Sequence, residues 1–155
     1  VEAAEAYYVA HRTALAYGVG PRLIHGDLHL ANVIVDGGRV SGLVDWEWAG
    51  GGEPDVDLAH LVRWAWFPAH PAEEALGPLV GAEQYLPLIP ALLEAYAEIG
   101  SLPRLWERLT IYEIEYDLHQ LTHSPCSTQA HERLRAWLHA RVLQTGTGDF
   151  SPSTR

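Results

Sequence analysis

Residues 25–32 read HGDLHLAN, and residues 42–59 read GLVDWEWAGGGEPDVDLA. These two stretches are separated by two β-rich segments, which are joined by Gly37 and Gly38. A pair of glycines favours the tight turn that connects the strands of a hairpin. The sequence therefore predicts a loop, a β-hairpin and a second loop, with polar residues gathered on both loops.

Three oxygen-bearing side chains lie on these loops: Asp27 and Asn32 precede the hairpin, and Asp45 follows it. Carboxylate and carboxamide oxygens are hard ligands suited to Mg2+, which keeps waters and shares its coordination shell with phosphates. A carboxylate that does not bind the metal could accept a proton from an attacking hydroxyl. If the loops converge, this set is the minimum for phosphoryl transfer, where catalysis is mainly positioning and charge neutralisation.

An Asp followed five residues later by Asn, then by a strand pair and a second Asp, is the order of the kinase catalytic loop and metal-binding Asp. The two stretches resemble the phosphotransferase family of aminoglycoside and choline kinases, whose pattern is HGDxxxxN, a hairpin, DWE and PxxDLA. The resemblance covers residues 23–62 closely. It implies an α+β fold that is mostly α: the C-terminal lobe of a protein-kinase-like fold, with a β-hairpin carrying the catalytic loop and a helical bundle.

The resemblance also implies roles for individual residues. Asp27 would be the catalytic base, and Asn32 and Asp45 would bind magnesium. Structural support of the catalytic loop would come from three further residues: His25, Gly26 and Asp57. Each has a simpler explanation in isolation, since an Asp or Asn before a turn is commonly an Asx cap and a carboxylate at a helix N-terminus is favoured by the dipole. The sequence departs from the family at Glu53, where Asp is usual, and we expect little consequence.

Four residues are candidates for substrate binding: Glu47, Glu113, Asp117 and Tyr116. Glu47 could touch metal-bound waters or a cationic substrate, or it could be a simple surface glutamate. Residues 103–123 predict a helix with two apolar stripes, and Glu113 and Asp117 share a polar wedge between them. Like charges at this i, i+4 spacing repel, so they need solvent or a cation. A pocket for a cationic substrate and a solvated acidic face therefore both remain open.

Length and composition narrow the class of protein. The chain has 155 residues, 48% of them hydrophobic, which is enough for one domain with a core, over 1–145, followed by a flexible tail over 146–155. A net charge of -10 disfavours nucleic acid and anionic membranes as partners. Cys126 is the only cysteine, and there is no membrane-length apolar run, so we expect a cytoplasmic protein.

The resemblance also requires parts that the chain lacks. A kinase of this type needs an N-terminal lobe with a glycine-rich strand turn over the phosphates of ATP and a lysine paired to a glutamate. No such motif precedes the catalytic loop, residues 1–22 contain no lysine, and the chain contains no methionine. We therefore expect a truncated lobe that is inactive alone, with Mg2+ and ATP, or GTP, as the cofactors of the whole protein.

Helices are predicted over residues 1–17, 56–65, 103–123 and 128–144, with another over 82–99 that is broken by two prolines. The substrate class, the oligomeric state and the fate of the missing lobe are left open. The candidates are aminoglycoside kinases, which confer antibiotic resistance, and kinases for choline, homoserine or a macrolide. The chain could also be a non-catalytic scaffold, the remnant of a kinase-like fold. A zinc site is a further alternative, because two pairs of histidines have i, i+4 spacing, but neither pair has the HExxH pattern.

Overall fold

The structure is a computed structural model of the chain, and it describes residues 2–66 and 87–123. The chain divides into two compact units. The central unit comprises Ala16–Leu105, and the terminal unit comprises Val1–Leu15 together with Trp106–Arg155. Each unit is described by itself.

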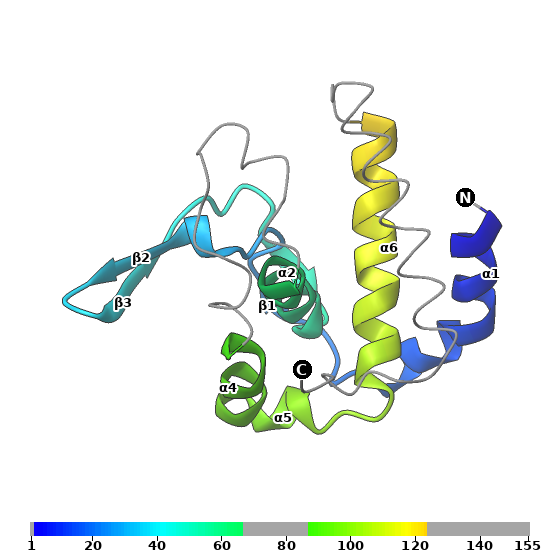
Figure 1. Cartoon of the computed structure of the whole chain (residues 1–155), viewed down its shortest axis with the longest axis horizontal. Helices are drawn as coiled ribbons and strands as arrows, with labels where there is room; N and C mark the ends of the chain where they lie inside the picture. The colour runs from blue at the N-terminus through cyan, green and yellow to red at the C-terminus, as the bar shows by residue number, and fades with distance from the viewer. Residues whose placement is uncertain (1, 67–86, 124–155) are drawn as a thin grey trace. The chain divides into compact units, whose positions relative to one another are not determined.

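The central unit contains the predicted hairpin (Figure 1). Strands β2 (Val33–Asp36) and β3 (Arg39–Leu43) pair antiparallel, with a register irregularity in the middle of β2. The turn residues Gly37 and Gly38 have φ of 55° and 75°. Two consecutive positive φ angles are typical of the hairpin turn whose twist matches that of the strands, and glycine adopts them without steric cost. The hairpin prediction is confirmed.

A second strand pair was not predicted. Strand β1 (Arg22–Ile24) pairs antiparallel with β4 (Gly50–Gly52), whose three glycines have little intrinsic strand propensity. The side chain of Ile24 lies over Gly52, where a Cβ atom would overlap it. The absence of side chains in β4 therefore leaves room for Ile24 of β1. The pairing of β1 with β4 brings the stretch at residues 25–32 close to the stretch at residues 42–59.

Helix α2 (Asp55–Trp66) follows β4 and confirms the helix predicted over 56–65. It packs against α4 (Leu88–Ala95), which leads to the short helix α5 (Ala97–Gly100). Apolar side chains of these three helices are buried and form the core of the central unit: Leu58, Ala59, Val62, Ile89 and Ile99. Packing in this core holds α2 in place, and α2 begins shortly after β4 ends.

The helical segment predicted over 82–99 is broken, but not at Pro90. The break between α4 and α5 lies at Tyr96, which has φ of −117° and ψ of 58°. Pro87 precedes α4, and Pro90 occupies its first turn, where backbone N–H groups have no intrahelical acceptor. A proline there removes no helical hydrogen bond, so the helix tolerates it. Residues 82–86 lie outside the described residues.

The terminal unit pairs α1 (Glu2–His11) with α6 (Leu105–His123), which begins at the last residue of the central unit. The predicted helix over 1–17 is an α-helix only to His11 and continues as a 3-10 helix, η1 (Arg12–Tyr17). Packing of α1 against α6 buries four residues, Ala4, Tyr7, Ile111 and Ile114, with Leu15 and Leu118 partly buried beside them. One predicted apolar stripe of α6 therefore faces α1.

The start of α6 differs by two residues from the prediction of 103–123. Arg104 has φ of 56°, a left-handed conformation that cannot continue a helix. Pro103 consequently lies before the helix rather than in its first turn. The predicted helix over 128–144 and the tail over 146–155 lie outside the described residues.

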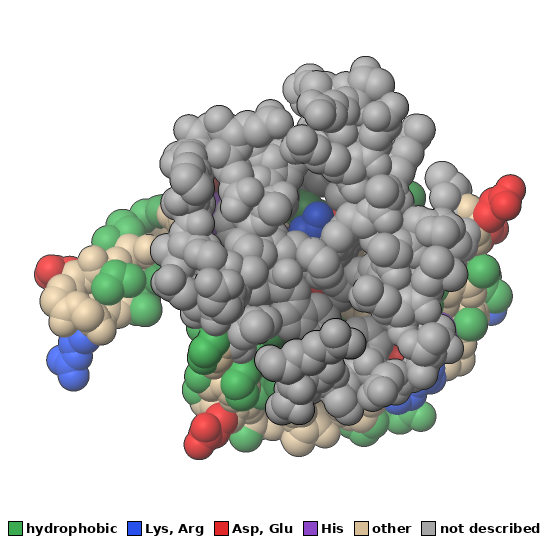
Figure 2. Space-filling view, viewed as in Figure 1, with side chains coloured by type: hydrophobic (Ala, Val, Ile, Leu, Met, Phe, Trp, Pro, Cys, Tyr) green, Lys and Arg blue, Asp and Glu red, His purple; other side chains and the backbone are tan. Residues whose placement is uncertain are grey.

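Apolar side chains are exposed along the hairpin of the central unit, where they gather on its surface (Figure 2). The cross-strand partners Val35 and Val40 are 60% and 66% exposed, and Ile34 is 47% exposed. An exposed apolar strand pair is uncommon on a monomer and indicates a surface that can be covered. Within the described part of the chain, no helix has the length and apolar character needed to cross a membrane.

Candidate active site

The first loop of the site follows β1, and Gly26 lies near the start of this loop. This residue has φ of 82°, and a Cβ atom on it would overlap the carbonyl group of Trp48. Only glycine satisfies both constraints. The Asp57 carboxylate, in the first turn of α2, accepts hydrogen bonds from the backbone N–H groups of His25 at 2.8 Å and Gly26 at 2.9 Å. This two-point contact is the geometry that a bracing role for Asp57 requires.

Asn32 closes the same loop from its other end. It terminates the short 3-10 helix η2 (Leu30–Asn32) and is 6% exposed. Its Nδ2 donates a hydrogen bond to the carbonyl oxygen of Asp27 at 3.0 Å and lies 3.3 Å from Nε2 of His29. Because the side-chain nitrogen is used within the loop, the side-chain oxygen Oδ1 remains for another partner.

Val44 joins this loop to the segment that follows the hairpin. Its backbone N–H donates to the carbonyl oxygen of Asn32 at 3.0 Å. Its own carbonyl accepts a hydrogen bond from Nε2 of His25 at 2.8 Å. His25 is 2% exposed, and its ring lies 4.7 Å from that of Trp46. Both backbone groups of the residue before Asp45 are therefore hydrogen-bonded to the loop that carries Asp27 and Asn32.

Asp45 adopts a left-handed conformation, with φ of 65°. Such a conformation is uncommon for a residue with a side chain, although Asp tolerates it better than most, and it is enriched at functional sites. The next residue, Trp46, donates from its indole nitrogen to the carbonyl oxygen of Leu43 at 2.9 Å. This contact fixes the bend at the end of β3 and leaves the Asp45 residue exposed.

The pKa of the Asp27 carboxyl depends on its burial and on the charged side chains near it. Burial raises the pKa of the Asp27 carboxyl above its ordinary value, and the negative charges of Asp45 and Glu47 raise it further. The imidazoles of His29 and His25 act in the opposite direction, and His29 Nε2 lies 3.5 Å from Asp27 Oδ2. Because charge interactions weaken with distance and solvent screening, Asp45 and Glu47 lie near enough to Asp27 to affect its pKa.

Glu47 is exposed on this region, and the indole nitrogen of Trp48 donates to its Oε1 at 3.0 Å. The neighbouring indole therefore orients the carboxylate. The geometry allows either of the two predicted interpretations, contact with a cation or a surface glutamate.

Glu53 has a role that the sequence did not indicate. Its carboxylate accepts hydrogen bonds from the backbone N–H groups of Val19 at 3.0 Å and Gly20 at 3.1 Å. A Cβ atom on Gly18 would overlap the Glu53 carboxylate. The carboxylate of Glu53, at a position where the family usually has Asp, anchors the segment that enters β1. The glycines at 18 and 20 were the only sequence signal.

The remaining predicted residues lie on α6, in the terminal unit, and are described apart from the catalytic loop. Glu113 and Asp117 are 0% exposed, and Tyr116 is partly buried. The interpretation of Glu113 and Asp117 as a solvated acidic face is therefore wrong. Two carboxylates on successive turns are removed from water together, which requires compensating polar or cationic groups.

The side chains of the site can be assessed as ligands of a magnesium ion. Among residues 2–66 and 87–123, no group of three or more His, Cys, Asp or Glu side chains is placed to hold a metal. Asn32 and Asp45 would therefore supply two ligands only, a carboxamide oxygen and a carboxylate. That fits Mg2+, which is commonly held by one or two protein ligands together with water and phosphate oxygens.

Comparison with known proteins identifies the class. The model of the phosphotransferase enzyme family matches residues 2–112, and the chain belongs to this family. The match confirms the resemblance found in the two sequence stretches. No curated protein matches the chain.

Two solved structures resemble the chain, both thermostable mutants of aminoglycoside phosphotransferase APH(4)-Ia. The apo form is 24% identical with a TM-score of 0.57, and a ternary complex with AMP-PNP and hygromycin B is 25% identical with a TM-score of 0.58. The likeness covers 96% of this chain but only 46% and 45% of theirs, so the chain spans just under half their length. A mostly helical fold with small antiparallel sheets is thus confirmed as that of a phosphotransferase.

Proposed function

We propose that the chain carries the catalytic loop of an ATP-dependent O-phosphotransferase of the aminoglycoside phosphotransferase type. The reaction would transfer the γ-phosphate of ATP to a hydroxyl of a small cationic substrate in the cytoplasm. One observation carries the proposal: the loop of Asp27 and Asn32 is hydrogen-bonded to Val44, so Asp45 is held beside it. Phosphoryl transfer depends on such positioning more than on covalent chemistry.

Asp27 would act as the base. Its carboxylate accepts the proton of the substrate hydroxyl as that oxygen forms a bond to the γ-phosphorus, and the bond between this phosphorus and the β–γ bridging oxygen breaks to release ADP. A carboxyl whose pKa is raised by burial accepts a proton more readily than an ordinary aspartate. The Asn32 contact to the Asp27 carbonyl would fix the backbone from which this carboxylate projects.

Asn32 and Asp45 would hold Mg2+ through Oδ1 and a carboxylate oxygen. The bound ion would neutralise charge on the phosphate oxygens of the nucleotide. Asp57, His25 and Gly26 would keep the loop in position through the hydrogen bonds and the close backbone approach described above. Glu53 would anchor the segment before β1 in the same way.

The nucleotide would need more protein than this chain. The relatives of known structure are about twice as long, and one of them was crystallised with AMP-PNP. We therefore expect the 155 residues alone to be inactive, or nearly so, and to act together with a nucleotide-binding lobe. ATP or GTP would serve as the phosphate donor.

The cationic substrate is the least constrained part of the proposal. Net charge of -10 attracts cations, and the exposed Glu47 lies close enough to Asp27 to influence its pKa. Glu113, Asp117 and Tyr116 remain candidates for the substrate pocket. Hygromycin B in the complex of the relative supports an aminoglycoside-like substrate, and kinases for choline, homoserine or a macrolide are alternatives.

The test uses a full-length protein that contains this chain. It is incubated with Mg-ATP and a panel of aminoglycosides, macrolides, choline and homoserine, and ADP release is measured. Replacing Asp27→Asn is expected to lower kcat by about 100-fold to 10,000-fold, the usual contribution of a general base. Asp36→Asn is the matched control, because Asp36 is an exposed aspartate at the hairpin turn. Unchanged turnover in the Asp27 variant would refute the assigned base.

The rival reading of a non-catalytic scaffold needs a separate measurement. Mg-AMP-PNP is titrated into the same full-length protein and into an Asp45→Asn variant by calorimetry. The proposal expects magnesium-dependent binding that is weakened in the variant. Absence of nucleotide binding to the folded, unaltered protein would favour the scaffold reading.

A further inference from the structure

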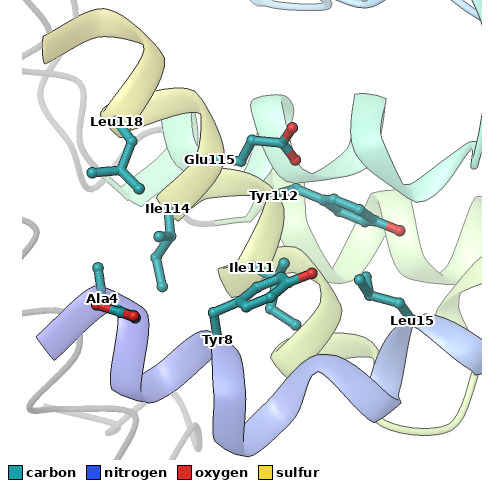
Figure 3. A pocket seen from close by; sticks show the side chains of 9 residues that line it. Ala4, Tyr8, Leu15, Ile111, Tyr112, Ile114, Glu115 and Leu118 are labelled. Carbon is teal, nitrogen blue, oxygen red and sulfur yellow. The ribbon is translucent and has the colours of Figure 1, made fainter. Parts of the chain in front are cut away.

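The terminal unit contains a cavity that the proposed reaction does not use. It lies between α1 and α6 and has a volume of about 460 Å³. Its buried wall comprises Ala4 of α1 and Ile111 and Ile114 of α6, which are 2% to 4% exposed. Figure 3 shows Ile114 and Leu118 of α6 and Tyr8 of α1 lining the space between the two helices. The volume lies in the range of small-molecule sites.

One end of this cavity is held in place by Arg108, which is 0% exposed. Its Nη1 donates to the carbonyl oxygens of Ala14 at 3.2 Å and Leu15 at 3.0 Å, and its Nη2 donates to the Tyr112 hydroxyl at 3.1 Å. These bonds tie the end of the first helical segment to α6. Leu15 and Tyr112 both line the cavity, so its wall is fixed by a buried hydrogen-bonded group.

Two acidic side chains contribute to the lining of the cavity. Among the described residues that line it, the charged ones are Glu5 of α1 and Glu115 of α6, and both are exposed. A carboxylate at the wall of a cavity attracts a cation.

We infer that this cavity binds an organic ammonium ion with an apolar, preferably aromatic, body. The aliphatic wall would cover the apolar body, and a carboxylate of the lining, Glu5 or Glu115, would pair with the ammonium group. Tyr8, which is 44% exposed, offers a ring face to the same cation. A polyhydroxylated polycation fits less well, because the aliphatic wall offers its hydroxyl groups no hydrogen bonds. The site is thus distinct in ligand chemistry from the acceptor site of an aminoglycoside kinase.

The test compares phenethylammonium with 2-phenylethanol, which has the same body without the charge. Each is titrated into a full-length protein that contains this chain, and binding is followed by NMR shifts of the Ile111 and Ile114 methyl groups. The ammonium is expected to bind more tightly, and its affinity is expected to fall as salt is raised. The double variant Glu5→Gln, Glu115→Gln is expected to bind the ammonium about threefold to tenfold more weakly, because an exposed ion pair contributes modestly to affinity.

The matched control is Glu2→Gln, a change on the same helix at an exposed residue that does not line the cavity. It is expected to leave ammonium affinity within about twofold of the original. Equal affinities for the ammonium and the alcohol would overturn the inference, as would equal losses in the control and the double variant. Absence of methyl shifts at Ile111 and Ile114 up to millimolar ammonium would overturn it as well. None of these outcomes depends on catalytic activity.

Discussion

His25 donates a hydrogen bond from Nε2 to the carbonyl oxygen of Val44 at 2.8 Å, across 19 residues of sequence. A carbonyl oxygen only accepts hydrogen bonds, so the proton on this imidazole lies on Nε2. The contact joins the start of the catalytic loop to the residue that precedes Asp45. His25 is therefore a positioning residue of the proposed site rather than an acid or base.

Replacing His25→Ala is expected to lower the free energy of unfolding by about 2–3 kcal/mol, because a buried hydrogen bond and the packing against Trp46 are both lost. His25→Gln retains a side-chain donor near the position of Nε2, so a smaller loss is expected. Urea unfolding measures stability, and kcat of the full-length protein measures positioning. If Gln restored stability but not kcat, the Val44 contact would not be what holds Asp45.

Gly26→Ala is expected to destabilise the chain by at least about 2 kcal/mol. The left-handed conformation alone costs a residue with a Cβ atom about 1–2 kcal/mol, and overlap with the Trp48 carbonyl adds to it. Gly42→Ala is the control, because a Cβ atom there meets only Ile34 Cδ1 at 3.9 Å. That change is expected to stay within about 1 kcal/mol. Similar unfolding free energies for the two variants would contradict the steric argument.

His60 of α2 predicts a loss of stability in acid. The residue is 7% exposed, and burial lowers its pKa from 6.5 to about 4, although the Asp57 carboxylate opposes that shift. The unfolded chain therefore binds the proton first as pH falls. The contribution of neutral His60 is fully present above pH 6.5 and is lost as pH falls toward 4. This loss amounts to about 2–3 kcal/mol between pH 7.5 and 4.5.

The measurement is urea unfolding of the original chain and of His60→Gln at several pH values. Gln cannot titrate, so the difference in unfolding free energy between the two proteins should shrink or reverse as the pH is lowered. Other groups titrate in both proteins and cancel in this difference. A difference that stays constant from pH 7.5 to 4.5 would show that His60 is not held neutral by burial.

The parts of the fold that could be predicted from the sequence are those that depend on residues close together in the chain. Gly37 and Gly38 specify their turn through their own backbone freedom, and the apolar periodicity of α2 reflects contacts within its own length. The β1–β4 pair has no such signature, because three glycines carry no side-chain pattern and the partner strand is 30 residues away, at Arg22 opposite Gly52.

The candidate site divides in a similar way. Asp27, Asn32, Asp45 and Asp57 could be predicted because their side chains match a motif. Val44 could not, since its two contacts are made by backbone atoms and do not depend on its residue type. Glu113 and Asp117 were placed correctly on one wedge of α6, but periodicity states which residues share a face and not what covers that face.

The exposed valines of the hairpin predict how the chain behaves in solution. Val35 and Val40 are cross-strand partners, each at least 60% exposed, so replacing both with Thr removes apolar surface without opening a cavity. The unfolding free energy is expected to change by less than about 0.5 kcal/mol, while aggregation measured by light scattering decreases. Val62→Thr, at a 0% exposed position, is the control and should cost about 1–3 kcal/mol. A comparable cost for the hairpin pair would mean that these side chains are buried in solution.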